Sequence, residues 1–117
     1  MVERVKSRLD ATYAALADST RRAILERLNQ QEARVTDVAR GLPMSLNAVS
    51  KHIRVLEDAG LIRRHVNGRE HVLSIDPTPL AEAASWIEHY RQFWETRADA
   101  LVAHLESKSR TTPRRRP

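Results

Sequence analysis

Asn47, Lys51 and Arg54 follow one another at intervals of four and three residues. On an α-helix these intervals place the three side chains on a single face, within about 60° of one another. An asparagine amide can pair with adenine, and lysine and arginine can donate to the acceptor atoms of guanine in a DNA major groove. The same residue types also cover ordinary solvated helix faces, so their meaning depends on the elements that carry them.

The segment around these residues has the features of one complete helix, predicted over 45–59. Ser45 is a residue type that caps helix N-termini, and Gly60 is one that ends helices in the left-handed conformation. The opposite face is apolar and should pack on the preceding helices; it consists of Leu46, Val49, Ile53 and Leu56. Ser50 lies between the two faces. His52 lies at the edge of the apolar face, where a packed or hydrogen-bonded histidine is favoured over a metal ligand or a general base.

A β-hairpin is predicted directly after this helix. Two β-rich runs, 61–66 and 69–75, are separated by Asn67-Gly68, which is typical of a type I′ turn with positive φ at both central residues. The two-residue loop pairs Val66 with Arg69, Arg64 with His71, Arg63 with Val72, and Ile62 with Leu73.

Basic residues concentrate on this hairpin, at Arg63, Arg64 and Arg69. Together with Asn67 they can reach phosphates or a minor groove, as the wing of a winged helix does. A solvated hairpin with incidental charges is the alternative. The position of the hairpin, directly after a helix with a polar outer face, favours the wing.

The remaining pattern is helical. Helices are predicted at 5–16, at 19–30, after Thr36, and from about 77 to 106. Asp18 or Ser19 can cap the second of them. The short helix after Thr36 should stop at 41–43, since proline disfavours helical geometry in the residue before it. Two helices joined by a tight turn and followed by a hairpin form a winged helix-turn-helix, a mainly α fold with a small β-hairpin.

Two lines of apolar residues run along the predicted last helix. Leu80, Ile87, Trp94 and Leu101 recur at an interval of seven, with Trp86, Tyr90 and Phe93 beside them. A helix with two apolar lines must bury both, one on its own core and one elsewhere. Because aromatic anchors dominate interfaces, we expect a homodimer; burial of both lines in the core of one chain is the alternative. The predicted interface residues are Leu80, Ile87, Tyr90, Trp94 and Leu101.

The net charge of +5 comes from the C-terminal end of the sequence. Residues 108–117 hold five basic side chains and no acid, whereas the rest of the 117 residues balances basic and acidic groups. We expect one domain over 1–107 and a basic disordered tail over 108–117. The tail is either a solvated end or an arm that binds phosphates without sequence preference.

Composition argues against several functional classes. The absence of cysteine removes disulfides, thiolate metal sites and cysteine nucleophiles. With only three glycines there is no glycine-rich phosphate loop, and the serines and threonines are explained as caps or surface residues, so we expect neither an enzyme nor a cofactor. No apolar run has the length of a membrane span or a secretory signal, which predicts a cytoplasmic protein that does not bind membranes.

The sequence resembles the ArsR family of winged-helix transcriptional repressors. The resemblance rests on A-L-A-D-S-T-R-R-A-I-L-E-R-L at 15–28, on S-L-N-A-V-S-K-H-I-R-V-L-E-D-A-G-L-I at 45–62, and on the wing through Asp76. The closing stretch 79–101, with its W…Y-R-Q-F-W pattern, is similar to a branch whose members are autoregulators or local repressors and generally lack metal sites.

The resemblance implies a dimeric repressor or autorepressor bound to a palindromic operator in double-stranded DNA. It implies that the helix 45–59 lies in the major groove, that the hairpin 61–75 contacts the backbone, and that the first and last helices form the dimer interface. The DNA-binding residues that it implies are Ser45, Asn47, Ser50, Lys51, Arg54, Arg63, Arg64, Asn67 and Arg69.

The sequence departs from the metal-sensing members of this family. Their third helix carries a cysteine motif, whereas the corresponding stretch here is V-T-D-V-A-R-G. A second site in the family uses ligand pairs on the last helix, but Glu88 and His89 are adjacent and point about 100° apart. We therefore predict no metal site. The alternatives are a metal-responsive repressor that uses histidines and carboxylates, or a winged-helix module that binds another protein. An effector or a protein partner of unknown identity is compatible with either reading.

Overall fold

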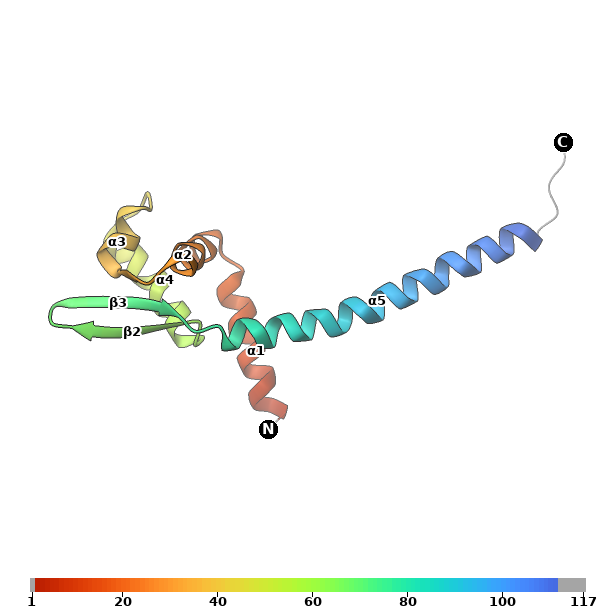
Figure 1. Cartoon of the computed structure of the whole chain (residues 1–117), viewed down its shortest axis with the longest axis horizontal. Coiled ribbons are helices and arrows are strands. Elements are labelled where there is room, and N and C mark those ends of the chain that lie inside the picture. Colours follow the sequence, from red (N-terminus) through yellow and green to blue (C-terminus); the bar gives the residue numbers. More distant parts are fainter. Residues whose placement is uncertain (1, 112–117) are drawn as a thin grey trace. The chain divides into compact units, whose positions relative to one another are not determined.

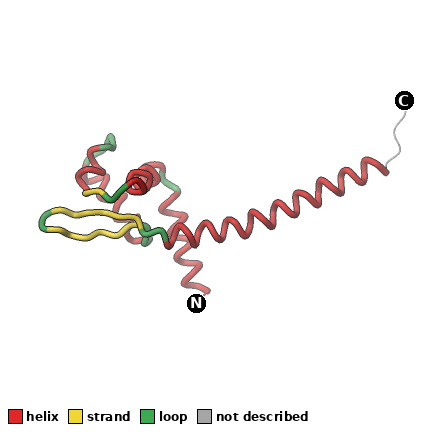
Figure 2. The backbone as a smooth tube through the Cα atoms, viewed as in Figure 1, coloured by secondary structure: helices red, strands yellow, loops and turns green. Residues whose placement is uncertain are grey.

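The computed structural model describes the backbone of residues 2–111 and the side chains of residues 8–109. It divides after Ala83 into two units, Met1–Ala83 and Ala84–Pro117, which are described separately. Figure 1 labels the elements and Figure 2 shows that helices dominate. In chain order these are α1 (Val2–Leu16), α2 (Ser19–Gln30), β1 (Ala33–Arg34), α3 (Val35–Arg40), α4 (Leu46–Asp58), β2 (Ile62–Asn67), β3 (Glu70–Ile75) and α5 (Thr78–Thr111).

The ends of α2 and α4 are set by the local signals that the sequence predicts. Asp18, rather than Ser19, caps α2, and its carboxylate accepts a hydrogen bond from the backbone N–H of Arg21 at 3.0 Å. The hydroxyl oxygen of Ser45 caps α4 by accepting from the N–H of Ala48 at 3.1 Å. Gly60 follows α4 with a φ of +78°, a conformation in which an L side chain is strained.

α3 begins slightly earlier than predicted. Its first residue is Val35, so Thr36 lies inside the helix rather than before it. The residue before it, Arg34, has extended backbone and provides no side-chain cap. β1 directly precedes α3 and pairs with β3. This pairing fixes where the chain can turn into the helix, and sequence reasoning did not predict β1 at all.

The sheet has three antiparallel strands in the order β1-β3-β2. The predicted hairpin register is wrong by two positions, because Asn67 pairs with Glu70 and the two-residue loop is Gly68-Arg69. Gly68 has a φ of +66°, and among the described residues no non-glycine has positive φ. This is the pattern of a type II′ turn, which needs glycine only at its first central position, whereas a type I′ turn would force Asn67 to positive φ.

The shift of two positions changes the partners in the hairpin but keeps each side chain on its predicted face. Arg64 now pairs with Leu73, and Ile62 pairs with Ile75. Ile62 and Leu73 are buried, and Ile75 packs against the core partly buried, so this face closes the core as expected.

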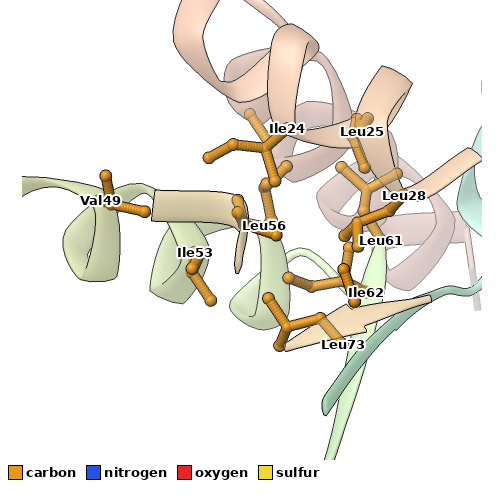
Figure 3. Packing of buried hydrophobic residues seen from close by; sticks show 12 residues of the cluster. Ile24, Leu25, Leu28, Val49, Ile53, Leu56, Leu61, Ile62 and Leu73 are labelled. Carbon is orange, nitrogen blue, oxygen red and sulfur yellow. The ribbon is translucent and has the colours of Figure 1, made fainter. Parts of the chain in front are cut away.

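The core lies between α2, α4 and the sheet (Figure 3). Its largest contributors are Ile24, Leu25, Leu28, Val49, Ile53, Leu56, Leu61, Ile62 and Leu73. The prediction of an apolar inner face on α4 holds for three of its four residues. Leu46 is wrong, since 52% of it is exposed. Leu46 lies in the first turn of α4, before Val49, which is the first residue of this helix in the core. It lines a surface groove instead.

α5 continues to Thr111, beyond its predicted end near Glu106. Residues 112–117 of the predicted basic tail lie outside the described residues, so the prediction for them stays a prediction. From Ala84 to Ser109 every side chain is exposed. No helix within residues 2–111, α5 included, combines the length and the apolar character that a membrane crossing requires.

Candidate nucleic-acid interface

The outer face of α4 presents hydrogen-bond donors that have no partner among the described residues. Asn47, Lys51 and Arg54 are exposed, on the side away from the buried residues of the same helix. The side chains of Lys51 and Arg54 form no hydrogen bond or ion pair with another described residue, although the positive charge of Arg54 helps to lower the pKa of Glu57. These donors are therefore available to an external acceptor, and Ser50 lies half-buried beside them.

Ser45 stands exposed at the N-terminus of the same helix. Its hydroxyl oxygen is used by the cap, but the hydroxyl hydrogen can still be donated to an anion. The unpaired N–H groups of a first helical turn and the positive end of the helix dipole favour a phosphate at such a position. Ser45 can thus cap α4 and at the same time donate a hydrogen bond to a phosphate of a bound DNA backbone.

Arg64 is occupied by the protein itself. Its guanidinium makes two bonds to the carboxylate of Glu57, Nε to Oε2 at 3.0 Å and Nη2 to Oε1 at 2.7 Å. Nη1 also lies 3.1 Å from Nδ1 of His71. The arginine hydrogen bonds lower the pKa of Glu57 below its ordinary value, and only 29% of the Arg64 side chain is exposed. Arg64 lies within β2, opposite Leu73, and ties the hairpin to α4. Its predicted contact with DNA stays a prediction.

The other hairpin arginines are more accessible. Arg63 pairs with Asp76 at 2.8 Å but keeps 75% of its side chain exposed. Arg69 occupies the second turn position rather than the strand, and it has no hydrogen bond or ion pair to any described residue. Asn67, the last residue of β2, is exposed close to it. Arg69 and Asn67 therefore form the tip of the hairpin.

A groove of about 260 Å³ joins the hairpin to the first turn of α4. It brings Ser50 and Arg69, which sequence reasoning proposed separately, onto one surface. It also includes Leu46 and two residues that sequence reasoning missed, Arg34 and Thr36. Arg34 pairs with Asp37 at 3.0 Å and lies 3.7 Å from Glu70. The only sequence signal for it is a basic residue just before a short helix.

The histidines do not gather into a site. His52 is half-buried and hydrogen-bonded, the interpretation that the sequence favours. His65 and His71 lie on opposite faces of the hairpin, since one pairs with Val72 and the other with Val66. Among the side chains of residues 8–109 there is no group of three histidines or carboxylates placed to hold a metal ion.

Comparison with known proteins agrees with this architecture. A helix-turn-helix domain family matches residues 16–65. Over 96 residues the chain is 44% identical to the HTH-type transcriptional regulator Rv2034 of Mycobacterium tuberculosis, covering 82% of this chain and 86% of that protein. The transcriptional repressor SdpR of Bacillus subtilis is 27% identical over 82 residues, covering 70% of this chain and 91% of SdpR.

Solved structures agree as well. The crystal structure of RHA00566, described as an ArsR family transcriptional regulator, superimposes with a TM-score of 0.73 at 38% identity. The match covers 77% of this chain and 93% of that one. Its fold and the extent of the match to Rv2034 agree with the resemblance seen in the sequence. The chain therefore belongs to the ArsR family of winged helix-turn-helix transcriptional regulators.

Proposed function

We propose that this regulator is a homodimeric repressor that reads a palindromic operator with α4 in the major groove and the β2–β3 hairpin as its wing. One observation carries the proposal. The side chains of Lys51 and Arg54 expose donors on the outer face of α4 that bond to no other described residue, whereas the Arg64 guanidinium nearby is held by Glu57 and His71. Exposed cations with free donor groups, on the second helix of a helix-turn-helix, are suited to the acceptor atoms of bases.

The neighbouring groups complete the contact. Asn47 can pair with adenine, and the exposed Leu46 beside it can contact the methyl group of thymine. The hydroxyl groups of Ser45 and Ser50 lie near the N-terminus of α4, where they can donate hydrogen bonds to phosphates of the DNA backbone. Arg69 and Asn67 at the hairpin tip reach the backbone or the minor groove of the adjacent turn. Arg63 can join them by exchanging Asp76 for a phosphate.

The dimer rests on the apolar face of α5 beyond Ala83. Its large apolar side chains are between 42% and 62% exposed: Trp86, Ile87, Tyr90, Phe93, Trp94, Leu101, Val102 and Leu105. The aromatic rings form a continuous row, with centroids 4.5 Å apart for Trp86–Tyr90, 6.4 Å for Tyr90–Phe93 and 5.7 Å for Phe93–Trp94. Monomeric proteins rarely expose apolar surface of this extent, and a second copy of α5 would cover it.

Leu80 stands apart from the other predicted interface residues. It is half-buried and packs against the core of the first unit. Its role in the dimer stays a prediction, and α5 beyond Ala83 carries the stronger case. SdpR, which is named a repressor, supports repression as the outcome of operator binding.

A footprint on the DNA upstream of the protein's own gene tests the dimeric mode of reading. Two half-sites should be protected in the major groove, with centres about 10 base pairs or a multiple of one helical turn apart. Both should disappear together as the protein is diluted. A single protected patch without a symmetric counterpart would contradict a dimer on a palindrome.

Arg69 and Arg64 are expected to respond differently to alanine. Arg69→Ala should weaken operator and random DNA alike and lower the salt slope of binding by about one unit, because it removes one phosphate contact. Arg64→Ala should lower the melting temperature, because it leaves the Glu57 carboxylate without its bidentate partner. Salt titrations and thermal unfolding of both variants measure this. An unchanged melting temperature with a reduced salt slope in Arg64→Ala would make Arg64 a phosphate contact instead.

A further inference from the structure

The side chain of Arg21 connects three helices. From the first turn of α2, its Nε donates to the carbonyl oxygen of Ala15 at 2.7 Å and its Nη2 to that of Ala14 at 3.1 Å, both at the end of α1. Its Nη1 lies 3.2 Å from Nδ1 of His52 on α4. A guanidinium can only donate, so this contact is a hydrogen bond in the tautomer of His52 whose Nδ1 accepts.

Asp18 belongs to the same cluster. Its Oδ1 accepts from the backbone N–H of Arg21 at 3.0 Å and lies 3.8 Å from Nδ1 of His52. The Arg21 N–H is the main reason why the pKa of Asp18 is lowered. The carboxylate therefore remains charged beside the Arg21 guanidinium and holds the first turn of α2 in place. His52 is only 24% exposed at this junction.

α1, to which Arg21 is bonded, is itself fixed to the first turns of α5. Arg8 pairs with Glu82 at 2.8 Å, and the Tyr13 hydroxyl donates to the carbonyl of Ala83 at 2.9 Å. A chain of directional polar contacts thus leads from the start of α5 through α1 and Arg21 to His52. None of these side chains lies on the outer face of α4 that carries Lys51.

The contact with His52 differs in kind from the rest of the packing of α4. Val49, Ile53 and Leu56 are completely buried. Apolar contacts are non-directional, so they determine mainly the distance of α4 from the core and restrain its rotation less. A hydrogen bond has a preferred direction and also restrains the rotation of the helix about its axis. His52 directly follows Lys51 and precedes Arg54 by two residues. A rotation of α4 that breaks the bond therefore moves both donors.

We propose that Arg21 and His52 are positioning residues that orient the base-reading face of α4 relative to α1, a role that rests on the proposed function. The bond requires an acceptor at the position of Nδ1 of residue 52. An asparagine carries its amide oxygen at the equivalent position, one bond from Cγ, whereas a glutamine carries it one bond farther out. The two amides are a matched pair that differs mainly in where the acceptor lies.

The test compares His52→Asn with His52→Gln in the full-length protein. His52→Asn should bind the operator within about threefold of the wild type, whereas His52→Gln should bind it about tenfold more weakly with little change on random DNA. Arg21→Lys, which keeps the charge but loses the planar fork, should resemble His52→Gln. Equal operator affinities for both His52 variants would overturn the proposal, as would equal losses on the two DNAs.

A measurement without DNA separates this proposal from the proposed function. The imidazole ¹⁵N shifts of His52 at neutral pH should show an unprotonated Nδ1 and a protonated Nε2, and Arg21→Lys should alter them. A proton on Nδ1 would overturn the bond itself. If the wild type does not prefer its operator over random DNA, the proposal that α4 reads bases fails, regardless of the ¹⁵N shifts of His52. If it has that preference and both His52 variants retain it, only the positioning role fails.

Discussion

Trp94→Asp is expected to convert the dimer into a monomer and to weaken operator binding by about a hundredfold or more. Trp94 is 62% exposed in the single chain and lies within the aromatic row of α5. A carboxylate there would have to be buried, unpaired, against the apolar face of the second copy. Without the dimer the second half-site no longer benefits from a high effective concentration. Sedimentation at micromolar concentration and an operator titration measure both effects.

Thr96→Asp is the matched control. It places the same charge two residues farther along α5, about 160° around the helix from Trp94, at a position that is not one of the large apolar side chains. Thr96 is exposed, so the variant should remain a dimer and bind the operator as the wild type does. A dimeric Trp94→Asp protein, or a monomeric Thr96→Asp protein, would show that a different surface joins the two copies.

Lys51→Ala and Arg54→Ala should each cost about 1–3 kcal/mol of operator binding and much less on random DNA. Both side chains are exposed and form no hydrogen bond or ion pair with another described residue, so their removal should cost the fold little beyond helix propensity and, for Arg54, its attraction to the Glu57 carboxylate. The loss should therefore appear in base recognition and leave the melting temperature almost unchanged. Parallel titrations on operator and random duplexes at one salt concentration provide the measurement.

Arg54→Lys separates base reading from charge. Lysine keeps the positive charge but lacks the planar pair of donors that fits the O6 and N7 atoms of guanine. Binding to random DNA should be retained while operator binding falls. If Arg54→Ala instead weakens both DNAs equally, Arg54 contacts phosphate and another face of α4 reads the bases.

The helix that carries these residues could be predicted from sequence because its signals are local. Ser45 and Gly60 mark its ends through caps that involve only neighbouring residues, and the structure confirms both. Val49, Ile53 and Leu56 repeat at helical spacing and are buried as expected. Which side of α4 faces outward follows from that spacing alone.

The hairpin shows where local signals become ambiguous. Asn67-Gly68 and Gly68-Arg69 can both form a two-residue turn, and the sequence pattern favours the first. The second keeps Asn67 in the strand without strain, and the structure adopts it. The pairing of β1 with β3 is non-local and involves two residues, too few to produce a periodic pattern. The sequence pattern therefore does not indicate that Arg34 lines a groove between the hairpin and α4.

Side-chain pairing is the part of the site that sequence spacing does not reveal. Arg64 and Arg69 both look like wing cations, yet only the fold brings Glu57 of α4 against Arg64. Leu46 looks like a core residue by spacing, yet the inner face of α4 ends at Val49. In both cases the position of a neighbouring element decides the role, and helical periodicity carries no information about that neighbour.

The most direct test of sequence-specific DNA recognition is the ratio of two affinities measured at the same salt concentration. One duplex spans the DNA immediately upstream of the protein's own gene, and the other has the same composition in shuffled order. Equal composition and salt cancel the phosphate contribution, so the ratio reports base reading alone. Outer-face donors on α4 predict a ratio of about 10³ or more. A ratio near one would contradict base reading by α4.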